Sequence, residues 1–136
     1  MAEFRIDGID ETIKALQKAG RFSEIAPKAV DAASPILEAA VKGAVEGAAN
    51  RGYATGELAG SIKKTKAKMN QWGAFAVVKA NGTDSKGVSN ADKLMRLEYG
   101  RSGQSAHPCL AGAVSSAEGA CISAMEEVVG RELGAE

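Results

Sequence analysis

Small apolar residues recur every three or four positions along two long segments, and this repeat limits the folds open to the chain. In the segment 27–50 the recurring positions are Val30, Ala33, Leu37, Ala40, Ala44 and Ala48. In the segment 109–133 they are Leu110, Val114, Ala117, Cys121, Ala124 and Val128, and Arg131 continues the same face. Such spacing places one apolar stripe along a helix. Because only 4% of the residues are aromatic, we expect two long helices that pack closely through small side chains.

Prolines and glycines set the expected ends of the helices. Pro27 suits the first turn of the first long helix, and Gly52 closes that helix. Pro35 should kink the helix or split it at Ser34, since proline removes a backbone donor and clashes with the preceding turn. Before the first long helix, a capping aspartate and apolar spacing predict a short helix over 11–18.

The apolar period changes between residues 62 and 80 to the alternation that is typical of strands. A first strand begins at Ile62, a turn follows at 70–73, and a second strand ends near Ala80. A possible further strand lies at 4–6. The first strand of this hairpin carries several lysines, which on an edge strand commonly block unwanted pairing with other chains. That structural role competes with any DNA-binding role for the hairpin.

Two polar segments, 81–90 and 101–108, are expected to be flexible loops. Between them, Asn90 can cap a short helix that Gly100 stops. The sequence therefore predicts a single α+β domain over residues 1–136. In that fold a small antiparallel sheet, made of the hairpin and the possible extra strand, packs against two long helices and one or two short ones.

Charge is balanced overall but unevenly distributed. Seventeen basic and seventeen acidic residues cancel, so net charge gives no drive toward nucleic acid or a membrane. A basic group lies on the first strand of the hairpin: Lys63, Lys64, Lys66 and Lys68. An acidic group lies toward the C-terminus: Glu126, Glu127, Glu132 and Glu136. These are either two solvated faces or the surfaces through which a polar subunit meets a neighbour or DNA.

The residues needed for catalysis are sparse. His107 and Cys109 are near neighbours, but residues two apart at the start of a helix usually point apart, so a thiol–imidazole pair is unfavourable. The chain has one histidine, and no spacing suggests a metal site or a phosphate-binding loop. On one helix, Cys109 and Cys121 are too far apart for a disulfide. We therefore expect no enzyme, no cofactor and no metal. No apolar run has the length of a signal peptide or membrane span, so we expect a protein made in the cytoplasm with no membrane partner.

Three segments resemble motifs of one family of bacteriophage proteins. Residues 55–62, Thr-Gly-Glu-Leu-Ala-Gly-Ser-Ile, resemble its T-G-x-L-x-x-S-I segment. Residues 97–102, Leu-Glu-Tyr-Gly-Arg-Ser, resemble its E-Y/F-G-T/R segment, and residues 106–113, with Pro108 and Leu110, resemble its a-x-P-F-L-x-P-A segment. The opening at 6–10 resembles its G-l-d-e-l start. The family is the small neck or tail-completion proteins of long-tailed bacteriophages, typified by the tenth gene product of the HK-ninety-seven phage.

Two positions depart from the pattern of that family. Cys109 stands where an aromatic residue is usual, and Gly112 stands where a second proline is usual. Both make the start of the last helix smaller and less rigid, which affects how this segment would pack against a neighbour.

The resemblance implies a virion structural protein at the head–tail junction. Members of the family are implied to assemble into rings between the portal and the tail tube, with the six-fold symmetry of the tail, although the free protein can be a monomer. The implied partners are further copies, phage head-completion and tail-tube proteins, and passing double-stranded DNA that is contacted without sequence specificity. Such a ring needs head-to-tail contacts that close after a fixed rotation.

Charge suggests how the copies would meet. We expect the basic hairpin of one copy to pack against the acidic C-terminal helix of the next. The alternative function is a nucleic-acid-binding module that uses the lysine hairpin. Against that alternative, aromatic residues for base stacking are scarce and the net charge is zero rather than basic.

The residues of the first motif have physical roles of their own. Thr55 can cap the short turn that Gly56 opens, and Leu58 and Ile62 should be buried against the sheet. Ser61 belongs to the same motif.

The second and third motifs also predict roles. Glu98 should accept hydrogen bonds from loop amides or pair with Arg101, and Tyr99, before Gly100, should be a core or interface anchor. Pro108, followed by Leu110, should fix the start of the last helix. Arg101 is the candidate for an exposed contact to a neighbour or to a phosphate.

Overall fold

The computed structural model describes residues 20–71 and 73–133, which form helices and short strands. In chain order the elements are α2 (Phe22–Asn50), α3 (Gly56–Gly60), β1 (Ile62–Lys64), β2 (Lys68–Asn70), β3 (Gly73–Phe75), β4 (Val78–Ala80), α4 (Asn90–Tyr99) and α5 (Leu110–Glu132). The predicted α+β class is confirmed. The helix expected at 11–18 and the strand expected at 4–6 lie outside the described residues.

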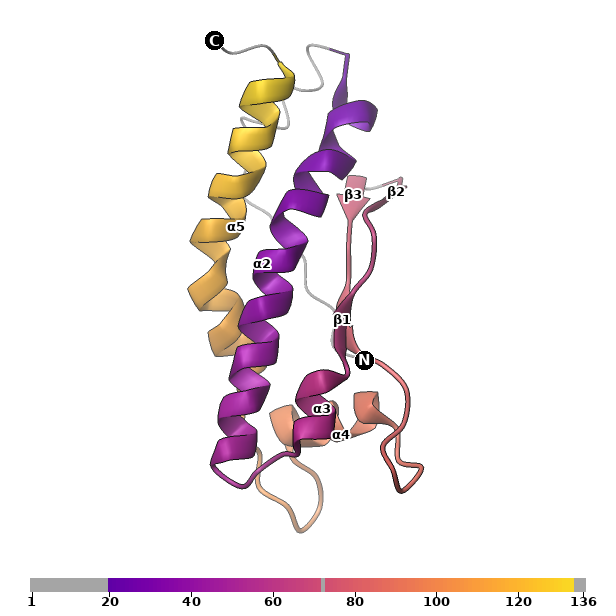
Figure 1. Ribbon diagram of the computed structural model, residues 1–136, viewed down its shortest axis with the longest axis vertical. Coiled ribbons are helices and arrows are strands. Elements are labelled where there is room, and N and C mark those ends of the chain that lie inside the picture. The colour runs from indigo at the N-terminus through magenta and orange to yellow at the C-terminus, as the bar shows by residue number, and fades with distance from the viewer. Residues whose placement is uncertain (1–19, 72, 134–136) are drawn as a thin grey trace.

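The two long helices, α2 and α5, run side by side in opposite directions (Figure 1). Ala33 of α2 and Ala117 of α5 are buried, and the Cys121 thiol donates across the contact to the Ala33 carbonyl oxygen at 3.6 Å. Small side chains on both helices allow this close approach, as the sequence predicted. The larger side chains of the same core are Ile25, Leu37, Val41, Val45, Leu110 and Met125.

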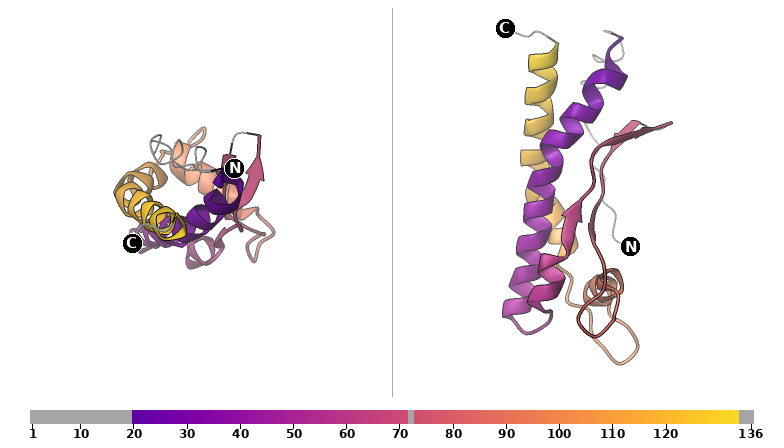
Figure 2. Two further views of the ribbon diagram at one scale, coloured as in Figure 1. Left: turned by 90° about the horizontal axis from the view of Figure 1, so that it is seen from above. Right: turned by 45° about the vertical axis from the view of Figure 1, so that its right-hand side comes forward.

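Helix α2 begins earlier than expected and continues through Pro35. It starts at Phe22, so Pro27 and Pro35 both lie inside it, and the predicted split at Ser34 is wrong. Buried residues of α2 continue on both sides of Pro35, and the packing of this face outweighs the loss of one backbone hydrogen bond. Figure 2 shows the N-terminal part of the helix inclining away from α5.

Residues 62–80, which we call the arm, form the expected antiparallel hairpin with its turn between Asn70 and Gly73. The pairing is interrupted midway, because Lys64 lies opposite Val78 whereas Lys68 lies opposite Phe75. Three residues separate the paired positions on the first strand and two on the second. The first strand therefore carries one extra residue, a β-bulge that the sequence pattern did not predict.

Helix α2 is the central element of the described structure. It contacts α5 on one side and the strands of the arm on the other, and the views in Figures 1 and 2 agree on this order. The short helices α3 and α4 gather at the end where α2 finishes and α5 begins (Figure 1). As a result, the arm and α5 lie on opposite sides of α2.

Candidate assembly surfaces

The four lysines singled out on the arm are all exposed. Lys63 and Lys64 lie on β1, Lys66 lies in the bulged segment, and Lys68 lies on β2. Lys63 is paired directly opposite Lys79 of β4, and like charges in this position destabilise a ladder. Within residues 20–71 and 73–133, none of these lysines has an ion-pair partner. An anionic partner would relieve the repulsion that the single chain leaves in place.

Two carboxylates of α2 hold the arm against the helix. The backbone N–H of Lys64 donates to Glu38 Oε2 at 2.8 Å, and that of Ala67 donates to Asp31 Oδ1 at 2.8 Å. Asp31 and Glu38 are seven residues apart, which is two helical turns, so they share one face of α2. These bonds occupy outward-facing amides of the first strand, which would otherwise be open to pairing with another chain. The sequence alone does not single out either residue, because carboxylates at this spacing are also typical of a solvated helix face.

The acidic group near the C-terminus divides into two parts. Glu132 is engaged within the chain by Lys28 Nζ at 3.1 Å and by Arg21 Nη2 at 3.8 Å. It is therefore not the free interface group that the charge pattern suggested. Glu126 and Glu127 are exposed on α5 and have no ion-pair partner in the described part of the chain. Glu136 lies outside the described residues.

Glu118 is a further exposed acid of α5, without an ion pair among the described residues. The outward face of this helix therefore carries Glu118, Glu126 and Glu127, together with the exposed Arg131 that the apolar repeat had placed on the buried side. Its other exposed residues are small: Ala111, Gly112, Ser115, Ser116, Gly119, Ala120 and Ser123.

The first family-like motif forms the corner between α2 and the arm, where the predicted cap at Thr55 and the predicted burial of Leu58 and Ile62 are confirmed. Thr55 is the N-cap of α3, and its Oγ1 accepts from the N–H of Leu58 at 3.3 Å. Gly56 opens the helix. Leu58 and Ile62 are fully buried. Ser61 Oγ donates to the Leu58 carbonyl oxygen at 2.6 Å, which closes the turn into β1.

The second motif joins α4 to the start of α5 through Glu98. Its Oε1 accepts from the N–H groups of Cys109 and Leu110 at 2.7 and 2.8 Å, and Oε2 accepts from that of Ala111 at 3.4 Å. Glu98 is only 7% exposed. It therefore supplies the cap that α5 lacks locally, because Cys109 at the N-cap position makes no side-chain cap bond. The predicted role as an acceptor of amide hydrogen bonds is confirmed, and the alternative pairing with Arg101 is absent from the described contacts.

The other residues of these motifs surround that cap. Tyr99 is 71% exposed, so its reading as a core anchor is wrong and the interface reading remains a prediction. Gly100 ends α4 at φ 72°, and a Cβ there would lie 2.8 Å from the Ala106 backbone nitrogen. Arg101 is exposed in the loop that follows, where its N–H donates to Gln104. Pro108 is exposed just before α5, and Leu110 is buried as its first residue.

His107 and Cys109 do not form a nucleophile and base in this structure. The His107 ring instead stacks on Tyr53, with the ring centroids 3.6 Å apart. Cys109 is a buried free thiol, and its pKa is raised by burial and then by the nearby Glu98. A raised pKa disfavours the thiolate that a nucleophilic cysteine needs. Cys121 is also a free, buried thiol.

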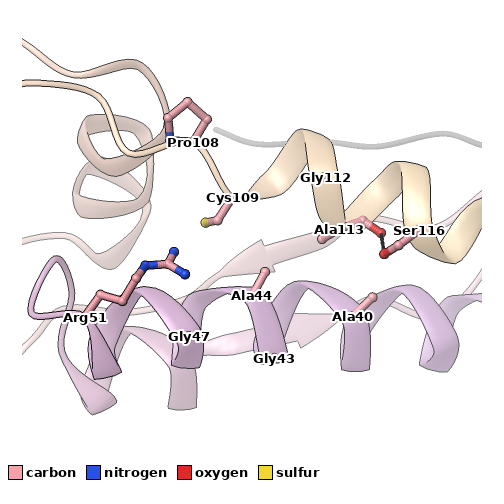
Figure 3. Close-up of a pocket in the computed structure, with 10 residues that line it drawn as sticks. All are labelled: Ala40, Gly43, Ala44, Gly47, Arg51, Pro108, Cys109, Gly112, Ala113 and Ser116. Atoms are coloured by element: carbon pink, nitrogen blue, oxygen red, sulfur yellow. Dashed lines mark hydrogen bonds between the residues drawn. The ribbon is translucent and has the colours of Figure 1, made fainter.

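A shallow groove of about 470 Å³ runs between α2 and α5 near this end of the molecule (Figure 3). Gly43, Gly47 and Gly112 contribute bare backbone to it, and nothing lies within 4 Å of a Cβ built at any of them. In Figure 3 the Arg51 guanidinium reaches toward the end of the groove at Cys109. The groove therefore results from glycine on both helices, with its positive charge at one end.

Asp84 organises the segment 81–90, which the sequence described only as a flexible loop. Its Oδ1 accepts from the N–H groups of Lys86 and Val88 at 2.8 and 2.9 Å, and its Oδ2 pairs with Lys93 Nζ at 2.9 Å. The hydrogen bond from Val88, with the Lys93 ammonium, lowers the pKa of Asp84 to about 2. Ser89 rather than Asn90 then caps α4, accepting from the N–H of Asp92. The sequence signal for this loop was the Asp-Ser-Lys-Gly run, which is typical of a tight turn.

No group of three or more histidine, cysteine, aspartate or glutamate residues in the described ranges is placed to hold a metal ion. None of the described helices is long and apolar enough to cross a membrane. No protein family, curated protein or solved structure is a match for the chain.

Proposed function

We propose that the protein is a structural subunit of a bacteriophage virion, forming a ring that completes the tail and joins it to the head. The family resemblance of segments 55–62, 97–102 and 106–113 supplies the role. The structure supports it through one observation: the exposed lysines of the arm, which have no ion-pair partner in residues 20–71 and 73–133, lie on the side of α2 opposite to α5. A subunit with a charged projection on one side and a different surface on the other associates head to tail, as a ring requires.

The motif residues fit a scaffold rather than a reaction. The Thr55 side chain caps α3, the Ser61 hydroxyl closes a turn, and the Glu98 carboxylate caps α5. Each fixes one element relative to the next, which gives the arm and α5 defined positions on α2. Rigid placement of contact surfaces is what a repeating assembly needs, because small angular errors accumulate around a ring.

Native mass spectrometry and negative-stain imaging across a concentration range test the proposal. We expect closed rings with a central hole, of about six copies as in the tail. Reversal of Lys63, Lys64, Lys66 and Lys68 to glutamate should abolish them. Intact rings from that variant would show that the lysines of the arm are not needed for ring formation. A strict monomer that shifts random duplex DNA in a salt-dependent way would contradict the ring.

That last outcome would support the second candidate, a nucleic-acid-binding module. The same exposed lysines favour it, since ammonium groups on a projecting hairpin can follow a phosphate backbone. Phe75, the nearest described aromatic residue of the arm, is half-buried and offers little for base stacking. We therefore expect any DNA contact to be weak and independent of sequence, as suits a ring through which DNA passes.

A further inference from the structure

Most exposed residues along the middle of the outward face of α5 are glycine, alanine or serine. Gly112, Gly119 and Glu126 are spaced by seven residues, or about two turns, so they lie in one line along the helix. Glycine inside a helix costs about 1 kcal/mol relative to alanine. Nothing lies within 4 Å of a Cβ built at Gly112 or Gly119, so no close contact with the described residues requires either glycine, although Gly112 also borders the groove between α2 and α5.

Acidic residues surround that line. Glu126 lies on it, while Glu118 and Glu127 point to opposite flanks of α5, each about 100° around the helix from that line. All three are exposed, and none has an ion-pair partner among the described residues. We call Gly112, Gly119, Glu118, Glu126 and Glu127 the acidic face.

The arm is complementary to this acidic face in charge and in shape. It presents four exposed lysines without carboxylate partners in the described ranges. Its first strand is hydrogen-bonded to α2 through Asp31 and Glu38, so these bonds fix its position on the helix. Because the exposed side chains along the middle of α5 are mostly small, the backbone of an arm can approach that helix closely.

The arm of one chain cannot serve its own α5, because the two lie on opposite sides of α2 (Figures 1 and 2). A second copy of the chain is therefore the partner that carries the matching surface. We infer that the arm of each copy docks across the acidic face of the next, with the lysines beside Glu118, Glu126 and Glu127. The inference rests on the proposed ring and names its repeating contact.

Charge exchange between the two surfaces tests the contact. The arm variant carries Lys63→Glu, Lys64→Glu, Lys66→Glu and Lys68→Glu, and the face variant carries Glu118→Lys, Glu126→Lys and Glu127→Lys. Each variant alone should associate at least about tenfold more weakly than the natural chain, since like charges then meet. An equimolar mixture should recover assembly in an alternating ring, and so should a chain that carries both sets.

Two controls keep this test specific. Lys86→Glu with Glu46→Lys changes exposed residues away from both surfaces and should leave association within about twofold of the natural chain. Circular dichroism melts should show each variant folded. Carbodiimide coupling of lysine amines to carboxylates, on a mixture of heavy- and normal-isotope chains, should join the arm to Glu118, Glu126 or Glu127 of a different copy.

The outcomes separate the inference from the proposed function. If the arm variant fails to assemble and neither the mixture nor the combined chain recovers, the arm is needed but α5 does not receive it, which overturns the inference alone. If couplings fall only within single chains while rings form, the inference fails in the same way. If the natural chain forms no assembly either alone or with tail-tube and head-completion proteins of the same phage, the proposed ring itself fails.

Discussion

Glu98 carries the contact on which the start of α5 depends. A helix leaves its first N–H groups without partners, and these are normally satisfied by a side chain next to them in sequence. Here the acceptor comes from another helix, eleven residues earlier than Cys109. The carboxylate also suits the positive end of the helix dipole. One side chain therefore caps α5 and fastens it to α4.

Replacing Glu98 tests this role. Glu98→Ala should lower the free energy of unfolding by about 2–4 kcal/mol, because two buried N–H groups lose their acceptor. Glu98→Gln keeps a carbonyl acceptor and should cost about 1 kcal/mol. Urea denaturation followed by circular dichroism measures both. Equal losses for the two variants would show that charge, rather than hydrogen bonding, is what matters.

Asp84 gives a prediction on pH. Its folded pKa of about 2 lies below the ordinary value of 3.8, so folding favours the charged form. The stability it contributes is present above pH 3.8 and is lost as the pH falls through 2. An NMR titration of the Asp84 carboxyl should have its midpoint near 2. A midpoint near the ordinary value would mean that the bonds to Val88 and Lys93 do not persist in solution.

At the scale of elements, the arm shows what the sequence can and cannot specify. The change of period at Ile62 and the turn at 70–73 predicted an antiparallel hairpin correctly, although each of its two expected strands is divided into two short ones. The bulge was not predictable, because one extra residue changes only the register between two strands, and register depends on the partner strand. The continuity of α2 through Pro35 likewise depended on its packing with α5, which no local pattern contains.

The attachment of the arm to α2 gives an element-scale prediction. Asp31→Ala with Glu38→Ala should remove the acceptors for the N–H groups of Ala67 and Lys64. Each bond contributes about 1 kcal/mol, so both amides should exchange with deuterium about five- to tenfold faster, and the free energy of unfolding should fall by about 2 kcal/mol. Glu46→Ala, an exposed change elsewhere on α2, is the matched control. Unchanged exchange in the double variant would mean that the arm is held in another way.

At the scale of the whole molecule, the segregation of charge gives a prediction on salt. Between about 0.1 M and about 1 M salt the Debye length falls from about 10 Å to about 3 Å. Association between the arm and the acidic face should therefore weaken steeply over this range. Sedimentation velocity at several salt concentrations measures it. Association that stays constant or strengthens with salt would indicate an apolar contact instead.

The candidate surfaces were predicted in outline and corrected in detail. The sequence identified the lysine group and the acidic end because charge is visible residue by residue. It grouped Glu132 with the other acidic residues near the C-terminus, but Arg21 and Lys28 engage that residue within the chain. It also missed the acceptor roles of Asp31 and Glu38. Contacts between residues far apart in sequence depend on the folded arrangement, which local spacing does not encode.

The central position of α2 also has a consequence for the order of folding during synthesis. α2 leaves the ribosome first of the described elements, yet the helix that covers its longest apolar face is α5, separated from it by residues 51–109. Contacts over such a separation close slowly, since the intervening chain must be ordered first. A nascent chain therefore exposes the apolar stripe of α2 until α5 is complete. Chains cut short before α5 would stay unfolded, and so would not enter an assembly with their surfaces incomplete.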